Sequence, residues 1–163
     1  QMTEVWDRVK ASGQIDELIA LFEENARVNP GLAQAQLELG NAYLQQLMSM
    51  TPGPQSGVVA TQADQAFDAA LTIDPNHWSA RFTKAVSLTF WPDFLGKKKD
   101  AIAQLEILIG QQEQRPAQPN YAQTYLYLGN LYEQQGDPEK ATAAWKKGLG
   151  LFPTNAELQG KVK

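Results

Sequence analysis

Few residues in this chain are of types that could do chemistry. It has one histidine, His77, and no cysteine, so it offers no thiol nucleophile, zinc knuckle or disulfide. Carboxylates occur as sequence neighbours, at 16–17 and 23–24, and neighbours on a helix do not face each other as an acid–base pair must. The glycines within 51–57 lack the spacing and the lysine of a phosphate-binding loop. We therefore expect no enzyme activity, no metal site and no cofactor.

Charge and hydropathy argue against two further kinds of binding. The 163 residues include 14 Lys and Arg against 18 Asp and Glu, a formal net charge of -4. Nucleic-acid binding needs clustered basic residues, and the one basic run, 97–99, is interpreted as a solvated turn before a helix, with a docking patch as the alternative. No apolar stretch approaches the roughly 20 residues that cross a bilayer. We expect no nucleic-acid partner and no direct membrane insertion of this segment.

The elements that must position any site are helices, because proline and glycine interrupt helical patterns at regular intervals and no strand pattern is present. Pro30, Pro75, Pro119 and Pro153 each end one helix, and after the last three a nearby Asn or Thr can cap the next. Pro138 follows a tight turn and lies where a first-turn proline is tolerated. The predicted helices cover about residues 2–11, 14–28, 32–49, 60–73, 77–91, 98–113, 120–135, 138–151 and 155–162.

Aromatic, small and proline residues recur near the C-terminus with the spacing of a 34-residue helix-turn-helix unit. These residues are Tyr125, Leu128, Gly129, Tyr132, Ala141, Trp145 and Pro153. The same order recurs upstream, with extra residues between the two helices, in Leu39, Gly40, Tyr43, Ala63, Phe67, Ala70 and Pro75. A weaker copy spans 80–108, and Phe22 with Pro30 marks the end of a degraded one. The pattern therefore predicts stacked repeats.

On these residues the chain resembles tetratricopeptide repeat proteins of bacterial type. The resemblance implies an all-α fold, a right-handed α-solenoid of antiparallel helix pairs in a single domain. The repeats would be a degenerate one at 1–30, one with an inserted turn at 31–76, a divergent one at 77–118 and a consensus-like one at 119–153. Residues 154–163 would start a capping helix. Solenoids of this kind mostly bind other chains.

Two glycines inside helical patterns support this register on physical grounds. Gly40 and Gly129 each cost roughly 1 kcal/mol relative to alanine in a helix interior. The sequence therefore predicts that a neighbouring helix passes too close for a side chain. Phe67 and Trp145 are predicted to fill the space between the helices.

The family's concave groove is lined by the first helix of each pair, and the resemblance carries its positions onto this chain by register. The candidate binding residues are Leu37, Asn41, Leu44, Phe82, Val86, Phe90, Leu126 and Asn130. Their neighbours on the same helix faces are Gln34, Gln45, Ser79, Thr89, Gln123, Glu133 and Gln134. The implied groove is nearly uncharged, apolar in its middle and rich in amides at both ends.

This composition decides between two ways of gripping a peptide. Family members that hold a C-terminal carboxylate use Lys and Arg in the groove, whereas Leu37, Ser79 and Gln123 replace the basic residues here. We therefore reject a carboxylate clamp. Asn41 and Asn130 either belong to the repeat consensus or bond the backbone of a ligand.

An apolar strip that suits an amphipathic helix or an extended peptide is formed by the groove candidates of the divergent repeat, Phe82, Val86 and Phe90. The alternative is that an insertion of this chain covers the strip and makes it core. The inserted turns at 48–61 and 91–97 are too apolar for purely solvated loops. They either pack over the groove or form a second binding site, and we favour packing for Trp91 and Phe94.

The expected function is that of a non-catalytic adaptor or scaffold, which binds an apolar or neutral peptide or helix of a partner protein in its concave groove. One alternative is a structural module that self-assembles into dimers or filaments. Another, an analogy at the level of the fold, is a periplasmic assembly factor of the cytochrome c maturation type. The lack of cysteine suits a periplasmic or a cytoplasmic location equally, and an N-terminal signal or anchor could have been removed before Gln1.

Overall fold

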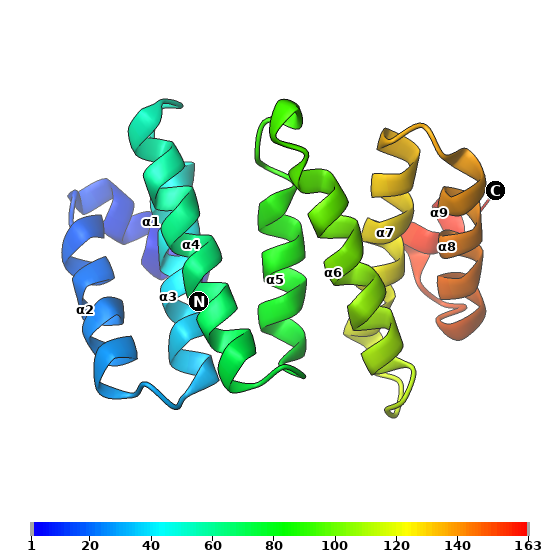
Figure 1. Cartoon of the computed structure of the whole chain (residues 1–163), viewed down its shortest axis with the longest axis horizontal. Helices are drawn as coiled ribbons and strands as arrows, with labels where there is room; N and C mark the ends of the chain where they lie inside the picture. The colour runs from blue at the N-terminus through cyan, green and yellow to red at the C-terminus, as the bar shows by residue number, and fades with distance from the viewer. Residues whose placement is uncertain (1, 163) are drawn as a thin grey trace. The chain divides into compact units, whose positions relative to one another are not determined.

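The computed structural model describes the backbone of residues 2–162 and the side chains of residues 4–162. The chain divides into two compact units, Gln1–Ala80 and Arg81–Lys163, called unit 1 and unit 2 below. Every regular element in the described part of the chain is helical, so the predicted all-α fold is confirmed (Figure 1). Unit 1 contains α1 (Met2–Ser12), α2 (Ile15–Val28), α3 (Ala33–Met48) and α4 (Pro54–Ile73).

Unit 2 begins inside a helix and continues with further helix pairs. Its elements are α5 (Trp78–Leu88), the 3-10 turns η1 (Asp93–Leu95) and η2 (Pro119–Tyr121), α6 (Lys97–Gln112), α7 (Ala122–Gln134), α8 (Pro138–Leu151) and α9 (Ala156–Lys161). Within the units, α3 runs antiparallel to α4 and α7 runs antiparallel to α8 (Figure 1). This pairing of successive helices is the arrangement of an α-solenoid.

Side chains cap several helices where the sequence predicts a restart. The Asp137 carboxylate accepts a hydrogen bond of 3.1 Å from the backbone N–H of Lys140, and the Asn155 side chain accepts one of 3.0 Å from that of Leu158. His77 Nδ1 accepts a hydrogen bond of 3.2 Å from the backbone N–H of Ala80. The single histidine therefore satisfies the start of α5, which is a structural role.

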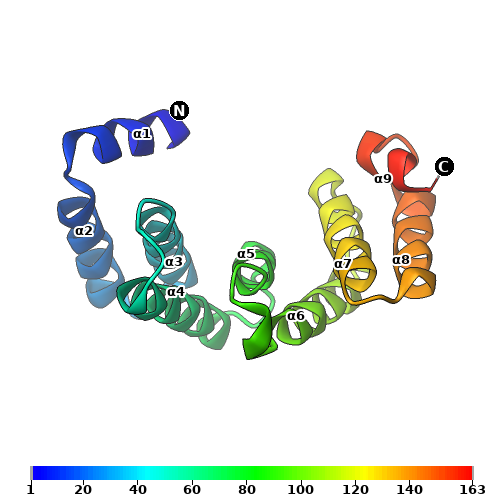
Figure 2. The same ribbon diagram turned by 90° about the horizontal axis from the view of Figure 1, so that it is seen from above.

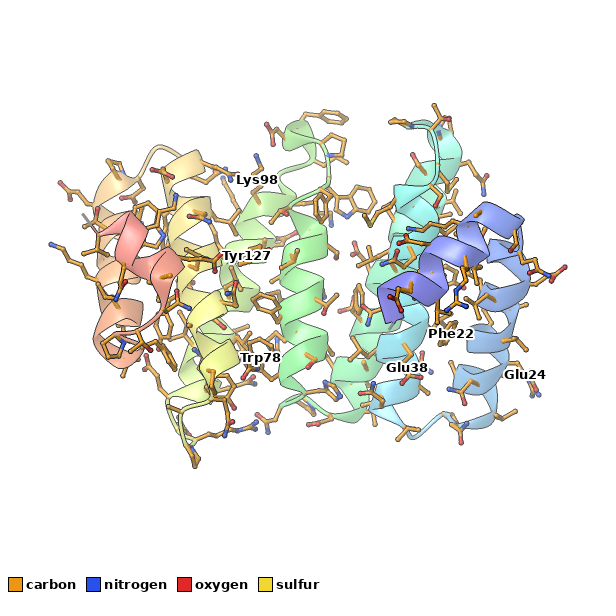
Figure 3. All side chains as sticks on the ribbon, turned by 180° about the vertical axis from the view of Figure 1, so that it is seen from behind. Phe22, Glu24, Glu38, Trp78, Lys98 and Tyr127 are labelled. Carbon is orange, nitrogen blue, oxygen red and sulfur yellow. The ribbon has the colours of Figure 1, made fainter. Side chains whose placement is uncertain are left out.

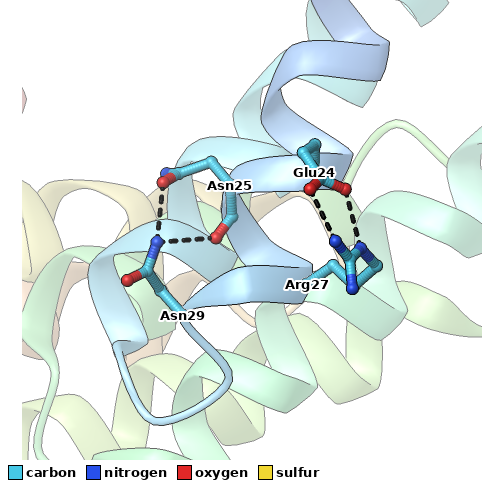
Figure 4. A network of polar contacts seen from close by, with 4 residues as sticks. All are labelled: Glu24, Asn25, Arg27 and Asn29. Atoms are coloured by element: carbon cyan, nitrogen blue, oxygen red, sulfur yellow. Dashed lines mark hydrogen bonds and ion pairs between the residues drawn. The ribbon is translucent and has the colours of Figure 1, made fainter.

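The end of α2 is closed by a small polar network (Figure 4). Asn29 donates from Nδ2 to the Asn25 carbonyl at 3.0 Å and to Asn25 Oδ1 at 2.9 Å. The same Asn25 carbonyl also accepts the backbone N–H of Asn29 at 3.1 Å, so the side chain adds a second bond at the end of the helix. Beside it, Arg27 and Glu24 form an exposed two-point ion pair at 2.6 and 2.7 Å. An exposed pair of this kind adds little stability.

Two predicted helix boundaries are wrong. Helix α4 begins at Pro54 instead of about 60, because Pro54 suits the first helical turn and Ser56 Oγ accepts a hydrogen bond of 2.9 Å from the Gly53 N–H. Most of the inserted turn at 48–61 therefore lengthens the second helix of the pair. Helix α5 ends at Leu88 instead of 91, since Pro92 disfavours a helical backbone conformation in the residue before it.

The predicted reason for the two helical glycines is confirmed. A Cβ atom added at Gly40 would lie 2.5 Å from Phe67 Cε1 on α4. One added at Gly129 would overlap the indole of Trp145 on α8, and that ring is held in place because its N–H donates to the Leu126 carbonyl at 3.3 Å. Both aromatic rings are buried, so each helix pair closes by pressing an aromatic ring onto bare backbone.

A third close approach escapes the repeat pattern. Gly148 on α8 faces the Tyr125 side chain, whose Cβ would lie 2.5 Å from an added Cβ.

A buried polar bridge joins α6 to α7: Thr124 Oγ1 donates to Gln112 Oε1 at 3.0 Å, and Gln112 Nε2 donates to the Tyr121 carbonyl at 3.2 Å. Buried polar groups that are bonded in this way fix one relative position of two helices.

Replacing Gly129 with alanine should destabilise the chain by about 1–3 kcal/mol, because the new Cβ atom must displace a ring that is hydrogen-bonded in place. The matched control is Gly110→Ala on α6, where an added Cβ meets nothing within 4 Å. The control should be neutral or gain up to about 1 kcal/mol. Urea unfolding followed by circular dichroism measures both, and equal midpoints for the two variants would contradict the close packing.

Candidate functional site

In unit 1 the candidate binding residues lie on α3, on what is called here the α3 face: Gln34, Leu37, Asn41, Leu44 and Gln45. Leu37 is buried in the core of the unit, Leu44 is half-buried against it, and Asn41 is exposed. The face therefore offers amide groups around an apolar centre. Along the helix, Gln34 Nε2 donates a hydrogen bond of 3.1 Å to Glu38 Oε1.

Helix α1 lies across the α3 face. Figures 2 and 3 show it extending from the start of α2 over α3. Lys10 Nζ donates a hydrogen bond of 2.9 Å to Gln45 Oε1. Trp6 is only 7% exposed, belongs to the same core cluster as Leu37, and stacks on Phe22 of α2 with ring centroids 6.1 Å apart. Part of the predicted groove in unit 1 is therefore occupied by the chain itself.

In unit 2 three of the candidates, Phe82, Val86 and Asn130, lie with Tyr127 on the first helices of two neighbouring pairs, on what is called here the α5–α7 face. All four side chains are half-buried. The Phe82 and Tyr127 rings meet edge to face, with centroids 5.3 Å apart at 80°, and Figure 3 shows Tyr127 on the side of α7 toward α5. Leu126 is buried in the core beneath. The face is apolar with amide and phenol groups at its edge.

Sequence reasoning missed Tyr127. The register places its neighbour Leu126 in the groove, yet the structure buries Leu126 and leaves Tyr127 half-exposed beside Phe82. A shift of one residue turns a helical position by about 100°, so a small error in register exchanges a core residue for a surface residue. The available signal was a third aromatic in a helix that already had its two repeat tyrosines.

Asn130 carries an unsatisfied group. Its Oδ1 atom is buried and has no hydrogen-bond partner among the residues that the structure describes. Burying an acceptor without a donor costs about 1–3 kcal/mol. A ligand N–H group would satisfy this oxygen, whereas nothing in the described part of the fold uses it.

Charged groups of unit 2 are paired away from this face. Tyr132 OH donates to Glu106 on α6, and burial together with that carboxylate raises the pKa of Tyr132 to about 12. Arg81 is buried, which lowers the pKa of its guanidinium, and its Nη1 donates to Gln104 Oε1 at 2.6 Å. At neutral pH the tyrosine therefore stays protonated and the α5–α7 face itself is uncharged.

The inserted turn after α5 divides into a packed part and an open part. Trp91 is half-buried against the core and Lys97 Nζ lies 5.9 Å from its ring centroid. Phe94 is 85% exposed and Phe90 is 73% exposed. The expectation that both Trp91 and Phe94 pack down therefore holds for Trp91 alone. Lys98 pairs with Asp93 at 2.7 Å, so the lysine run is partly neutralised.

The described residues contain no group of three or more His, Asp or Glu side chains placed to hold a metal ion. None of the helices between residues 2 and 162 combines the length and hydropathy that crossing a membrane requires. What the two faces offer is shape, apolar surface and amide hydrogen bonds. These are means of holding a polypeptide.

Comparison with protein families gives a match where the repeat pattern is strongest. Residues 122–155 match the family model of the tetratricopeptide repeat. Residues 122–155 are therefore a tetratricopeptide repeat, as the spacing of Gly129, Trp145 and their neighbours predicts, and the described part of the chain has the fold of tetratricopeptide repeat proteins. Proteins with this fold generally mediate protein–protein interactions and are generally non-catalytic. No curated protein matches the whole sequence.

Solved structures share the fold at low sequence identity. A thermophilic tetratricopeptide repeat protein of Thermus thermophilus, TTC0263, is 16% identical with a TM-score of 0.73, over 96% of this chain and 75% of that one. MamA of Desulfovibrio magneticus is 21% identical with a TM-score of 0.64, over 98% and 78%. A human IFIT1 dimer with PPP-AAAA is 14% identical with a TM-score of 0.73, but this chain covers only 34% of it.

Replacing Asn130 with alanine should leave the free energy of unfolding unchanged or raise it by about 1 kcal/mol, because the variant loses an unsatisfied buried acceptor and gains helix propensity. The comparison variant is Thr124→Val, which removes a satisfied buried donor and should lose about 1 kcal/mol. Thermal unfolding measures both. A large loss of stability in Asn130→Ala would show that the fold needs this side chain.

Proposed function

We propose that this protein is a non-catalytic adaptor that binds a neutral or apolar peptide or helix of a partner protein. The binding surfaces would be the outer faces of the first helix in each helix pair. The observation that carries the proposal is the α5–α7 face, where two aromatic rings in contact lie beside a buried amide oxygen that lacks a donor. Aromatic side chains of this kind give large contact area. If the half-buried Asn130 side chain turns toward the face, this oxygen would accept a hydrogen bond from a backbone N–H of the ligand.

The charges of the face select the class of ligand. None of the residues that define the face is basic, and nearby Arg81 bonds Gln104 while Lys98 bonds Asp93. A ligand held through a terminal carboxylate is therefore disfavoured. The net charge of -4 equally disfavours a nucleic-acid ligand.

The proposal is tested with a phage-displayed library of helical peptides selected on the full chain. Peptides so selected should bind at least tenfold more weakly to Phe82→Ala, which corresponds to about 1.4 kcal/mol for one truncated aromatic contact. Fluorescence anisotropy with the selected peptides measures the affinity.

The matched control for this experiment is Ile107→Ala, an exposed apolar side chain on α6. It should bind the selected peptides like the wild type, and circular dichroism establishes that both variants fold. Peptides that bind Phe82→Ala and the wild type equally would contradict the α5–α7 face as the binding site.

Self-association is a second candidate function, favoured by an apolar stripe on α2. Leu21 is 67% exposed and Val28, seven residues further along the same helix, is 54% exposed. Residues seven apart lie on one side of a helix, and an uncovered stripe at the first regular pair of a repeat array can pair with another copy.

If unit 1 associates through this stripe, the mass from light scattering rises with concentration. Leu21→Glu should restore a monomer, because association would then bury an unpaired charge in the contact. Leu151→Glu, which changes a leucine on α8 that is 51% exposed, should leave the mass unchanged. A wild type that stays monomeric across the concentration range would remove this candidate.

A further inference from the structure

The α3 face shows what kind of ligand it accepts, because α1 is seated on it. Two side chains of α1, four residues apart, connect this helix to the rest of unit 1. Trp6 enters the core cluster with Leu37 and stacks on Phe22 at an interplanar angle of 14°. Lys10 donates to Gln45 Oε1. Residues four apart lie on the same side of a helix, so α1 uses one side for both contacts.

We propose that the α3 face is a receptor for a short amphipathic helix with an aromatic anchor and a basic residue one turn later, and that α1 fills it in cis. The inference rests on the proposed function, since it assigns to unit 1 the chemistry of the partner. The partner is an amphipathic helix of another protein that presents Trp and Lys at positions i and i+4. To bind, that helix must displace α1.

The polar groups around the face suit a basic ligand. Gln45 offers a carbonyl oxygen, and Asn41 is exposed one turn earlier. Glu38 lies on the same helix and is labelled in Figure 3 on the side over which α1 crosses. All three groups accept hydrogen bonds from a lysine or an arginine, and the Glu38 carboxylate repels an acidic helix.

The connection of α1 to unit 1 is short and its helix is weak by itself. Only Gly13 and Gln14 separate α1 from α2, and Gly13 adopts a left-handed φ of 73° that favours glycine. A helix of 11 residues is marginal in water without a packed face. The tether makes α1 an intramolecular competitor at high effective concentration. The apparent affinity of a free partner helix is its intrinsic affinity multiplied by the fraction of chains in which α1 has left the face.

The test uses the full chain and a fluorescein-labelled synthetic peptide with the sequence of residues 2–12. Trp6→Ala removes the anchor of α1 and leaves the α3 face in place. The labelled peptide should bind Trp6→Ala at least tenfold more tightly than the wild type, as measured by fluorescence anisotropy. A peptide in which the tryptophan is alanine should lose at least tenfold in affinity for the same variant.

The matched control is Val5→Ala, a neighbouring α1 side chain that is largely exposed and should behave like the wild type. If Trp6→Ala does not fold, amide hydrogen exchange of the wild type decides: with excess peptide, exchange in α1 should become faster while α3 keeps its protection. Absence of both effects would overturn the proposal.

Two other outcomes also overturn it. A folded Trp6→Ala chain that does not bind the peptide would make α1 a purely structural helix, and the Phe82-dependent binding of selected peptides to unit 2 would be untouched by that failure. A wild-type dimer that Trp6→Ala dissociates would place α1 on a second copy of the chain and not in cis.

Discussion

The close approach of an aromatic ring to a glycine in the facing helix is the constraint on which both units depend. Phe67 lies against Gly40 in unit 1, and Trp145 lies against Gly129 in unit 2. Each contact leaves no room for a side chain, so it fixes both the distance and the register of a helix pair. A fixed register determines which positions of the first helix are buried and which remain on its outer face.

The residues available for binding follow from that register, and the two units use them differently. In unit 2 the α5–α7 face keeps Phe82 and Tyr127 half-exposed beside an amide oxygen without a donor. In unit 1 the equivalent helix face is covered by α1 through Trp6 and Lys10. The first-helix face is therefore open in unit 2, whereas in unit 1 it is covered by a helix of the same chain.

Much of the fold could be predicted because its signals are local. The helix pairs are predicted by three local signals: a glycine within a helical pattern, an aromatic residue at a set distance from it and a proline at each restart. As predicted, the buried rings of Phe67 and Trp145 lie against Gly40 and Gly129. The site was less predictable, since it depends on side-chain packing between helices distant in sequence. The repeat register does not decide whether Leu126 or Tyr127 is exposed on the face. The sequence around Trp6 likewise contains no signal that α1 crosses α3. Local capping at Ser56 also moved the start of α4.

Solution NMR of the full chain tests the central claim most directly. If the rings lie on the glycine backbone, the Hα protons of both glycines are shifted upfield by the ring currents and show nuclear Overhauser effects, Gly40 to the Phe67 ring and Gly129 to the Trp145 indole. Gly110, which faces no ring, should have ordinary Hα shifts. Ordinary shifts at Gly40 and Gly129, without effects to the rings, would contradict the account.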